Sequence, residues 1–130
     1  MKFSLVIQAS PFSHQSTATA FRFAQTLLDE GHELFRVFFY AEATLIANNQ
    51  ICSPQGEADL PQQWQTLAEE HQLDLVVCIA AAVKRGVIDD NEAKRYEKAS
   101  GNLRETFELS GLGQLAEAIA VSDRVITFGA

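Results

Sequence analysis

Short apolar runs alternate with segments of helical spacing along this chain, and this alternation constrains the fold most strongly. Residues 3–7 and 34–40 are rich in aromatic and β-branched side chains, which is typical of buried strands. Between these runs, five apolar residues recur on one helix face: Ala20, Phe23, Ala24, Leu27 and Leu28. Ser16 or Thr17 can cap the start of this helix, and Gly31 is placed to end it. The pattern predicts a β-α-β unit, whose strands are parallel because a helix connects them.

The same alternation continues through the rest of the chain. A helix is predicted over residues 59–71, with Pro61 tolerable in its first turn and four apolar residues on one face: Leu60, Trp64, Leu67 and Ala68. It leads into an apolar run at residues 74–80, which is typical of a fully buried parallel strand. A further helix is predicted from five apolar residues at helical spacing: Leu112, Leu115, Ala116, Ile119 and Ala120. Residues 125–128 predict a last strand.

Two polar regions interrupt this alternation. Residues 41–57 contain turn signals, and they predict a mobile surface segment with a short helix near residues 43–47. The charged residues 84–95 predict a loop and then a solvated helix that ends near Lys98.

Alternating strands and helices predict a single α/β domain over residues 1–130. We expect a three-layer sandwich with a mostly parallel, flavodoxin-like sheet of about five strands and right-handed crossovers. Hydrophobic residues make up 47% and charged residues 21% of the chain, which excludes a disordered or collagen-like protein. In such sheets, functional sites gather at the carboxyl ends of the strands.

The net charge of −7 argues against direct nucleic-acid binding, because affinity for phosphate backbones depends on clustered Lys and Arg. No apolar run approaches the roughly 18 residues that a membrane span needs. The run at residues 3–7 is shorter than the roughly 7 to 15 residues of a signal-peptide core, so it predicts a strand instead. We therefore expect a cytoplasmic protein without membrane contact, in which both cysteines stay reduced.

Cys78 is the main candidate for chemistry, because it lies near the end of the run at residues 74–80. Lys84 and Arg85 follow it closely, and their positive charge would favour the thiolate form. A packing role for the thiol, and an ordinary solvated role for the two cations, remain open from the residues alone. Cys52, in the irregular segment, and His14, in the loop after the first run, are weaker candidates for a resolving thiol and a ligand contact.

Other catalytic and binding motifs are absent. The chain has no phosphate-binding P-loop, no complete GxGxxG after a strand, no GxSxG and no HExxH. Its two cysteines lie in no CxxC and have no histidine at zinc-ligand spacing. Residues 110–113 could cradle an anion, but a helix-entry turn accounts for them as well. We therefore expect neither a cofactor nor a metal, and any chemistry depends on sulfur.

Several segments together carry a family resemblance. They are residues 20–24 and 31–33, residues 37–40, residues 77–82 with 85–87, and residues 110–115 with 123–125. On these segments, and over nearly its whole length, the chain resembles the TusD/DsrE proteins of bacterial sulfur relay, which belong to the DsrE/DsrF-like family. The resemblance implies that Cys78 carries a persulfide.

The resemblance also implies partners and a function. It implies a heterohexamer with TusB-like and TusC-like, or DsrH-like and DsrF-like, subunits, a TusA-like persulfide donor and a TusE/DsrC-like acceptor. The expected activity is that of a sulfurtransferase subunit in the 2-thiolation of tRNA wobble uridine. Residues 81–90 are expected to form part of a gate over the thiol, and an ordinary solvated loop remains the alternative for them. A DsrE-type subunit of dissimilatory sulfur oxidation and a noncatalytic structural subunit remain alternatives. A small-molecule-binding flavodoxin-like domain is disfavoured by the missing phosphate-binding glycines.

Overall fold

The computed structural model describes residues 1–130 as a five-stranded parallel sheet with helices on both faces. The strands are β1 (Lys2–Ile7), β2 (Glu33–Phe39), β3 (Leu75–Cys78), β4 (Phe107–Ser110) and β5 (Arg124–Phe128). The helices are α1 (Ser16–Asp29), the 3-10 helix η1 (Ala41–Ala47), α2 (Leu60–His71), α3 (Ile79–Val83), α4 (Asp90–Arg95) and α5 (Leu112–Val121). None of these helices is both long enough and apolar enough to span a bilayer.

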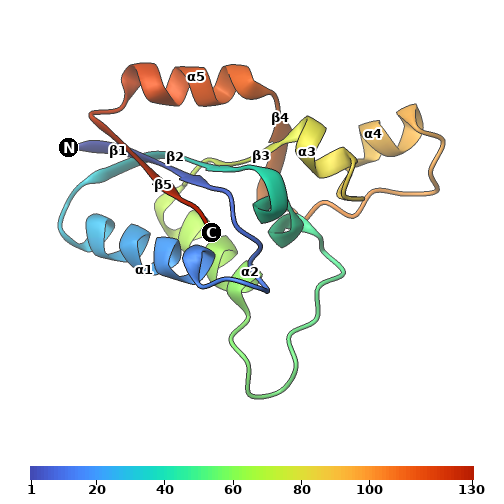
Figure 1. The fold of residues 1–130 in the computed structure, drawn as a ribbon, viewed down its shortest axis with the longest axis horizontal. Helices are drawn as coiled ribbons and strands as arrows, with labels where there is room; N and C mark the ends of the chain where they lie inside the picture. The colour runs from blue at the N-terminus through green and yellow to red at the C-terminus, as the bar shows by residue number, and fades with distance from the viewer.

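The strand order is β4-β3-β2-β1-β5, so the chain advances in one direction from β1 to β4 and then returns across the sheet to β5. Helices α1 and α2 cover one face, and α5 lies across the other (Figure 1). A right-handed connection in the reversed direction places its helix on the opposite face, which explains this arrangement. The predicted three-layer α/β fold is confirmed, although the order differs from the 2-1-3-4-5 order of flavodoxin.

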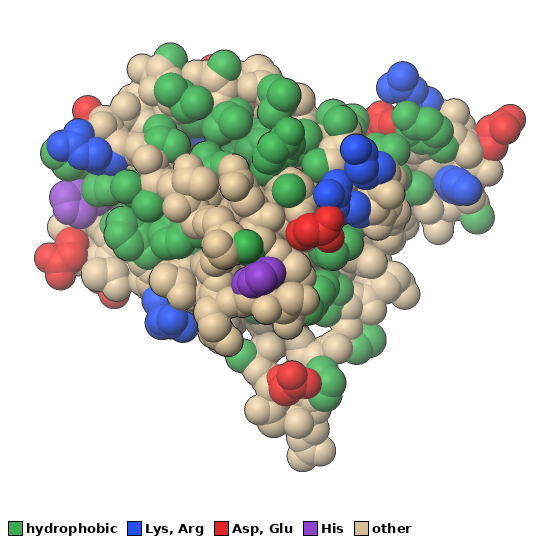
Figure 2. Space-filling view, viewed as in Figure 1, with side chains coloured by type: hydrophobic (Ala, Val, Ile, Leu, Met, Phe, Trp, Pro, Cys, Tyr) green, Lys and Arg blue, Asp and Glu red, His purple; other side chains and the backbone are tan.

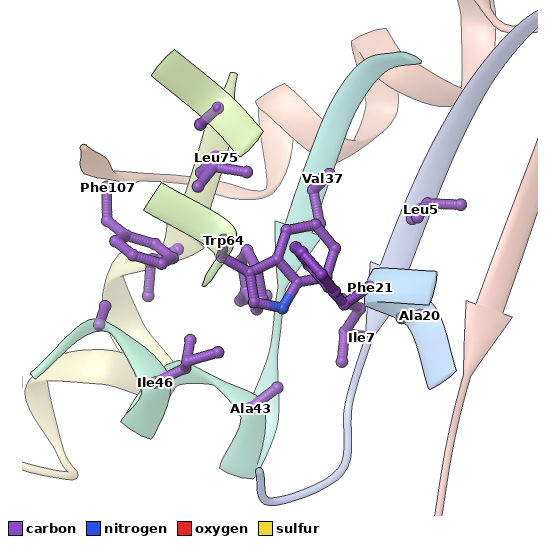
Figure 3. Packing of buried hydrophobic residues seen from close by; sticks show 14 of the residues in the cluster. Leu5, Ile7, Ala20, Phe21, Val37, Ala43, Ile46, Trp64, Leu75 and Phe107 are labelled. Atoms are coloured by element: carbon purple, nitrogen blue, oxygen red, sulfur yellow. The ribbon is translucent and has the colours of Figure 1, made fainter. Parts of the chain in front are cut away.

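The main core lies between the sheet and the pair α1 and α2. Trp64 of α2 is fully buried at its centre and makes edge-to-face contacts with Phe21 at 5.2 Å and Phe39 at 5.6 Å between ring centroids. Figure 3 shows the indole ring lying among side chains from α1, η1 and the central strands. Most of the residues that predicted α1 and α2 from helical spacing thus pack in the core, although Phe21, which was not among them, is buried and Phe23 is only partly buried.

Helix α5 buries a different face from the one predicted. Leu112 and Ile119 are 55% and 56% exposed, whereas Ala118 is 1% exposed. The sheet face beneath α5 is partly polar, because it carries the buried side chains of Ser4 and Arg36. The helix therefore turns a mixed surface toward the sheet and leaves much of its apolar stripe in solvent.

Arg36 anchors α5 to the sheet. Its side chain donates through Nε to Asp74 Oδ2 at 2.7 Å, and through one terminal nitrogen to Gln114 O at 2.8 Å and Glu117 Oε1 at 2.9 Å. Burial acts to lower the pKa of Arg36, but hydrogen bonds and charge pairing with both carboxylates raise that pKa above its ordinary value. The charged residue that interrupts an apolar run in the sequence thus connects β2, the start of β3 and α5.

Replacing Arg36 with methionine is expected to loosen α5. Arg36→Met keeps the apolar stem but removes three charge-assisted hydrogen bonds, so the free energy of unfolding should fall by about 1–3 kcal/mol. Urea unfolding measures this change, and hydrogen exchange should show faster exchange at the α5 amides. Lys2→Met is the matched control, since the Lys2 ammonium makes only exposed contacts, with Glu33 at 4.0 Å and with the Phe35 ring at 5.5 Å from its centroid. Unchanged exchange in α5 would show that Arg36 is not its anchor.

The segment after β2 differs from the prediction. Residues 41–47 form η1, in which Ala43, Ile46 and Ala47 are fully buried in the main core, so the expectation that residues 41–57 lie wholly at the surface is wrong for this part. The small side chains at positions 41, 43 and 47 allow η1 to pack against the carboxyl edge of the sheet. Most of residues 48–59 are exposed, as expected.

Candidate active site

Cys78 is the last residue of β3 and directly precedes the first turn of α3. The apolar run at residues 74–80 predicted a longer strand, but the chain becomes helical at Ile79. The thiol lies on the α5 side of the sheet, where Cys78 packs in a small cluster with Phe38, Val76 and Ala81. Cys78 is 3% exposed, so the thiol is sheltered at the carboxyl edge of the sheet.

The thiol nevertheless borders a pocket of about 270 Å³. Three chain segments line it, which are the end of β2, the β3–α3 segment and the start of α5: Tyr40, Ala41, Cys78, Ile79, Ala80, Ala81, Lys84, Arg85, Gly111 and Leu112. Small side chains next to the thiol leave this space open. The structure therefore places Cys78, Lys84 and Arg85, which were singled out from the sequence, on one pocket.

The two cations of the pocket have different surroundings. Arg85 is paired with Glu42 of η1, because two of its guanidinium nitrogens lie 2.8 Å from Glu42 Oε1. Lys84 is exposed and forms no ion pair. Figure 2 shows basic side chains beside an acidic one in the area below α3. Of the two charges expected to favour a thiolate, only that of Lys84 is uncompensated.

A tight turn fixes the chain after these cations. Gly86 has a φ of 79°, which a side chain would disfavour, and its N–H donates to Val83 O at 3.1 Å. Asn102 holds the turn from outside: its amide donates to Gly86 O at 2.8 Å and its carbonyl accepts from the Ile88 N–H at 2.9 Å. Residues 84–88 are thus tied to a distant part of the chain.

Cys52 and His14 do not belong to this pocket. Cys52 is exposed, forms no disulfide, and borders a separate hollow under the loop that precedes α2. His14 lines a hollow of about 610 Å³, which lies between α1 and that loop and contains no thiol. No group of three or more His, Cys, Asp and Glu side chains comes together to hold a metal. The pocket that Cys78 lines is thus smaller than the hollow beside His14.

Sequence reasoning missed several pocket residues. Gly111 and Leu112 line the pocket because β4 pairs with β3 and brings Ser110 opposite Cys78, and β4 was not predicted. The sequence predicts a strand position but no role for Tyr40, and it indicates no role for Glu42, which lies beside the pocket without lining it. Strand order would have pointed to Gly111, but no feature of the sequence points to Glu42.

This arrangement suits thiol exchange. A sheltered thiol on a small pocket can exchange sulfur with a group that enters the pocket while it remains shielded from bulk solvent. No histidine or carboxylate lines the pocket as a general base. The fold and the site together define a parallel α/β domain with a pocketed thiol at the carboxyl edge of its sheet.

The chain belongs to the DsrE/DsrF-like family, whose model matches residues 1–128. A protein of Allochromatium vinosum named "Putative sulfurtransferase DsrE" is 43% identical over 129 residues, which cover 99% of each chain. The crystal structure of the ychN protein from E. coli has a TM-score of 0.75 and 21% identity, and covers 98% of this chain and 99% of that chain. That structure supports the fold alone. The family resemblance stated from the sequence is confirmed.

Proposed function

We propose that this protein is a sulfurtransferase subunit that accepts a persulfide sulfur on Cys78 and passes it to another protein. The single observation that carries the proposal is the position of Cys78 on a pocket at the carboxyl edge of the sheet. The relative from Allochromatium vinosum, named as a putative sulfurtransferase and 43% identical, supports the same chemistry.

The reaction needs two thiol exchanges. In the first, the Cys78 thiolate attacks the outer sulfur of a donor protein's persulfide, the donor S–S bond breaks, and the donor cysteine leaves as a thiolate. In the second, an acceptor thiolate attacks the outer sulfur of the Cys78 persulfide, and Cys78 leaves as a thiolate. Each step exchanges one S–S bond for another without net oxidation, so the route uses neither a metal nor an organic cofactor.

The pocket supplies space and shelter for these steps. One added sulfur takes about as much room as a water molecule, about 30 Å³, so a pocket of about 270 Å³ can hold the persulfide and part of an incoming side chain. Burial of Cys78 limits access of small thiols and oxidants to the stored sulfur. The expected gate, residues 81–90, is kept in this proposal because Ala81, Lys84 and Arg85 line the pocket.

A loading assay tests the proposal. The purified protein is incubated with a persulfidated donor protein and separated from it, and cyanide then releases the stored sulfur as thiocyanate. About one equivalent of thiocyanate per chain is expected, in keeping with one pocketed thiol. No release above that of the untreated protein would contradict sulfur carriage.

Reversing the charge of Lys84 is expected to slow loading from the donor protein. Lys84 is the unpaired cation at the pocket, and an exposed charge contributes up to about 1 kcal/mol to an interaction, so Lys84→Glu should lower the rate about fivefold. Rapid mixing with a persulfidated donor, followed by quenching, gives the loading rate. The difference in rate between Lys84→Glu and the unsubstituted protein should shrink at high salt. Lys98→Glu is the control, because Lys98 is exposed and does not line the pocket. Equal rates in both variants would remove Lys84 from the site.

The partners and the route belong to the same proposal. We assign the chain to a heterohexamer with two paralogous subunits, TusB-like and TusC-like or DsrH-like and DsrF-like, fed by a TusA-like donor and discharged to a TusE/DsrC-like acceptor in the cytoplasm. The proposed end product is 2-thiolated wobble uridine in tRNA, while the DsrE name of the 43% identical relative favours dissimilatory sulfur oxidation as the second candidate. Loss of 2-thiouridine from the tRNA of a deletion strain supports the first route, and intact 2-thiouridine with impaired sulfur oxidation supports the second.

A further inference from the structure

Arg85 joins two of the three chain segments that line the Cys78 pocket. Its Nε and one terminal nitrogen lie 2.8 Å from Glu42 Oε1, next to the segment at residues 40–41. Its other terminal nitrogen donates to Ala81 O at 3.0 Å, which fixes the guanidinium on α3. The ion pair therefore ties η1 to α3 beside the pocket that contains the thiol.

The backbone beside Glu42 is held in an uncommon conformation. Ala41 has a φ of 50°, in the left-handed region that residues other than glycine rarely adopt. Such a conformation persists only where the surrounding contacts maintain it, and Ala41 itself lines the pocket. The Arg85–Glu42 pair lies one residue away from this turn.

The pair is exposed enough to exchange partners. The Arg85 and Glu42 side chains are 23% and 54% exposed, and an ion pair at such a site contributes little to stability. Cys78, in contrast, is 3% exposed, so a partner's sulfur needs some movement of the pocket walls to reach it. Because the Arg85–Glu42 pair is weak and connects two pocket walls, it can break at low cost when the walls move to admit a partner's sulfur.

We propose that Glu42 is a positioning residue that keeps Arg85 across the Cys78 pocket. An acidic side chain beside the partner's reacting cysteine then opens the pocket by taking the place of Glu42 in the ion pair with Arg85. The inference rests on the proposed role of Cys78 in accepting sulfur. It predicts the chemistry of the partner: a carboxylate close to the cysteine that gives or takes the sulfur. Arg85 then holds the partner during the exchange, while Lys84 remains free to attract it.

Two alkylating reagents of nearly the same shape test this. In a Cys52→Ser background, Cys78 is the only thiol, and its rate is measured with iodoacetate, which carries a carboxylate, and with neutral iodoacetamide. Each rate is normalised to the rate of glutathione with the same reagent. Glu42→Gln leaves Arg85 without its carboxylate, so the ratio of the iodoacetate rate to the iodoacetamide rate should rise about threefold. Adding Arg85→Gln should return the ratio to that of the parent.

The ratio separates partner exchange from simple loosening. A purely structural pair would raise both rates equally, and an unchanged ratio in Glu42→Gln would overturn the inference. Glu33→Gln is the control, because it breaks a similarly exposed pair with Lys2 at the opposite edge of the sheet and should leave both rates unchanged.

Salt provides a second test without substitution at the pair. Screening weakens an exposed ion pair, so added NaCl should speed the alkylation of Cys78 by neutral iodoacetamide in the parent protein. A rate that is independent of salt would overturn the inference. Alkylation needs no sulfur donor, so its outcome is distinguishable from that of the thiocyanate assay. If Cys78 accepts sulfur but the Arg85–Glu42 pair does not control access, thiocyanate is released and the alkylation ratio is unchanged. If the pair controls access but Cys78 does not accept sulfur, the ratio changes and no thiocyanate is released.

Discussion

Cys78→Ser is expected to abolish the passage of sulfur from the donor protein to the acceptor protein. A serine oxygen cannot form a persulfide, so transfer should fall to the level measured without this subunit. Donor protein carrying labelled sulfane sulfur, mixed with the assembled complex and the acceptor, gives the amount transferred. The expected loss is complete, because the pocket contains no other thiol.

Two further variants make this result specific. Cys52→Ser should transfer at the unsubstituted rate, since Cys52 lies outside the pocket. Cys78→Ala guards against a folding defect, because a buried serine hydroxyl without a partner costs about 1–3 kcal/mol, whereas alanine adds no polar group. If the complex containing Cys78→Ser transfers sulfur normally, the chain is a structural subunit and not a carrier.

Trp64→Ala is expected to have the largest effect on stability. Trp64 is fully buried between α1, η1 and the sheet, and its ring contacts those of Phe21 and Phe39. Removing a buried aromatic ring costs about 3–5 kcal/mol through lost packing and the cavity left behind. This is a large part of the roughly 5–15 kcal/mol that stabilises an ordinary domain. Denaturant unfolding followed by circular dichroism measures the loss.

Trp64→Phe is the matched comparison. Its ring preserves much of the packing, and the indole Nε1 that it removes has no hydrogen-bond partner in the structure. The cost should therefore stay well below that of alanine, at about 1–2 kcal/mol. Equal losses for the two variants would contradict ring packing as the main contribution of Trp64 to the stability of this core.

The two long helices of the main core could be predicted because each carries its own signal. Residues 16–31 combine a helical apolar face with an ending glycine, and Gly31 indeed has a φ of 85°. The predicted cap at Ser16 or Thr17 is wrong, because both residues lie inside α1 and the N-cap residue, Gln15, makes no side-chain cap. In α2, Asp59 caps the helix through the Gln62 N–H, and Pro61 lies in the first turn. These contacts are local, so the sequence contains them.

Other elements depend on distant contacts and could not be predicted. Strand β4 is only four residues long and contains Glu108, and it becomes a strand by pairing with β3 at the sheet edge. The buried face of α5 depends on Arg36, which comes from β2 and approaches the helix from the sheet. Apolar spacing alone predicted a helix there correctly but assigned the wrong face to the core.

The candidate site shows the same division. Cys78, Lys84 and Arg85 are close in sequence, so their approach to one another follows from the end of a strand and the short helix after it. The pairing of Arg85 with Glu42 spans 43 positions in the sequence. It gives Arg85 a different role from the predicted one, because the guanidinium connects two pocket walls and its charge is already paired. Only the folded chain reveals that contact.

The central claim is that the stored sulfur is on Cys78, and peptide mass analysis tests it most directly. The purified protein is incubated with a persulfidated donor, alkylated and then digested without reductant, and its two cysteine peptides are compared. The account predicts that the peptide containing Cys78 gains the mass of one sulfur atom and that the peptide containing Cys52 does not. A gain on the Cys52 peptide alone, or on neither peptide, would contradict it.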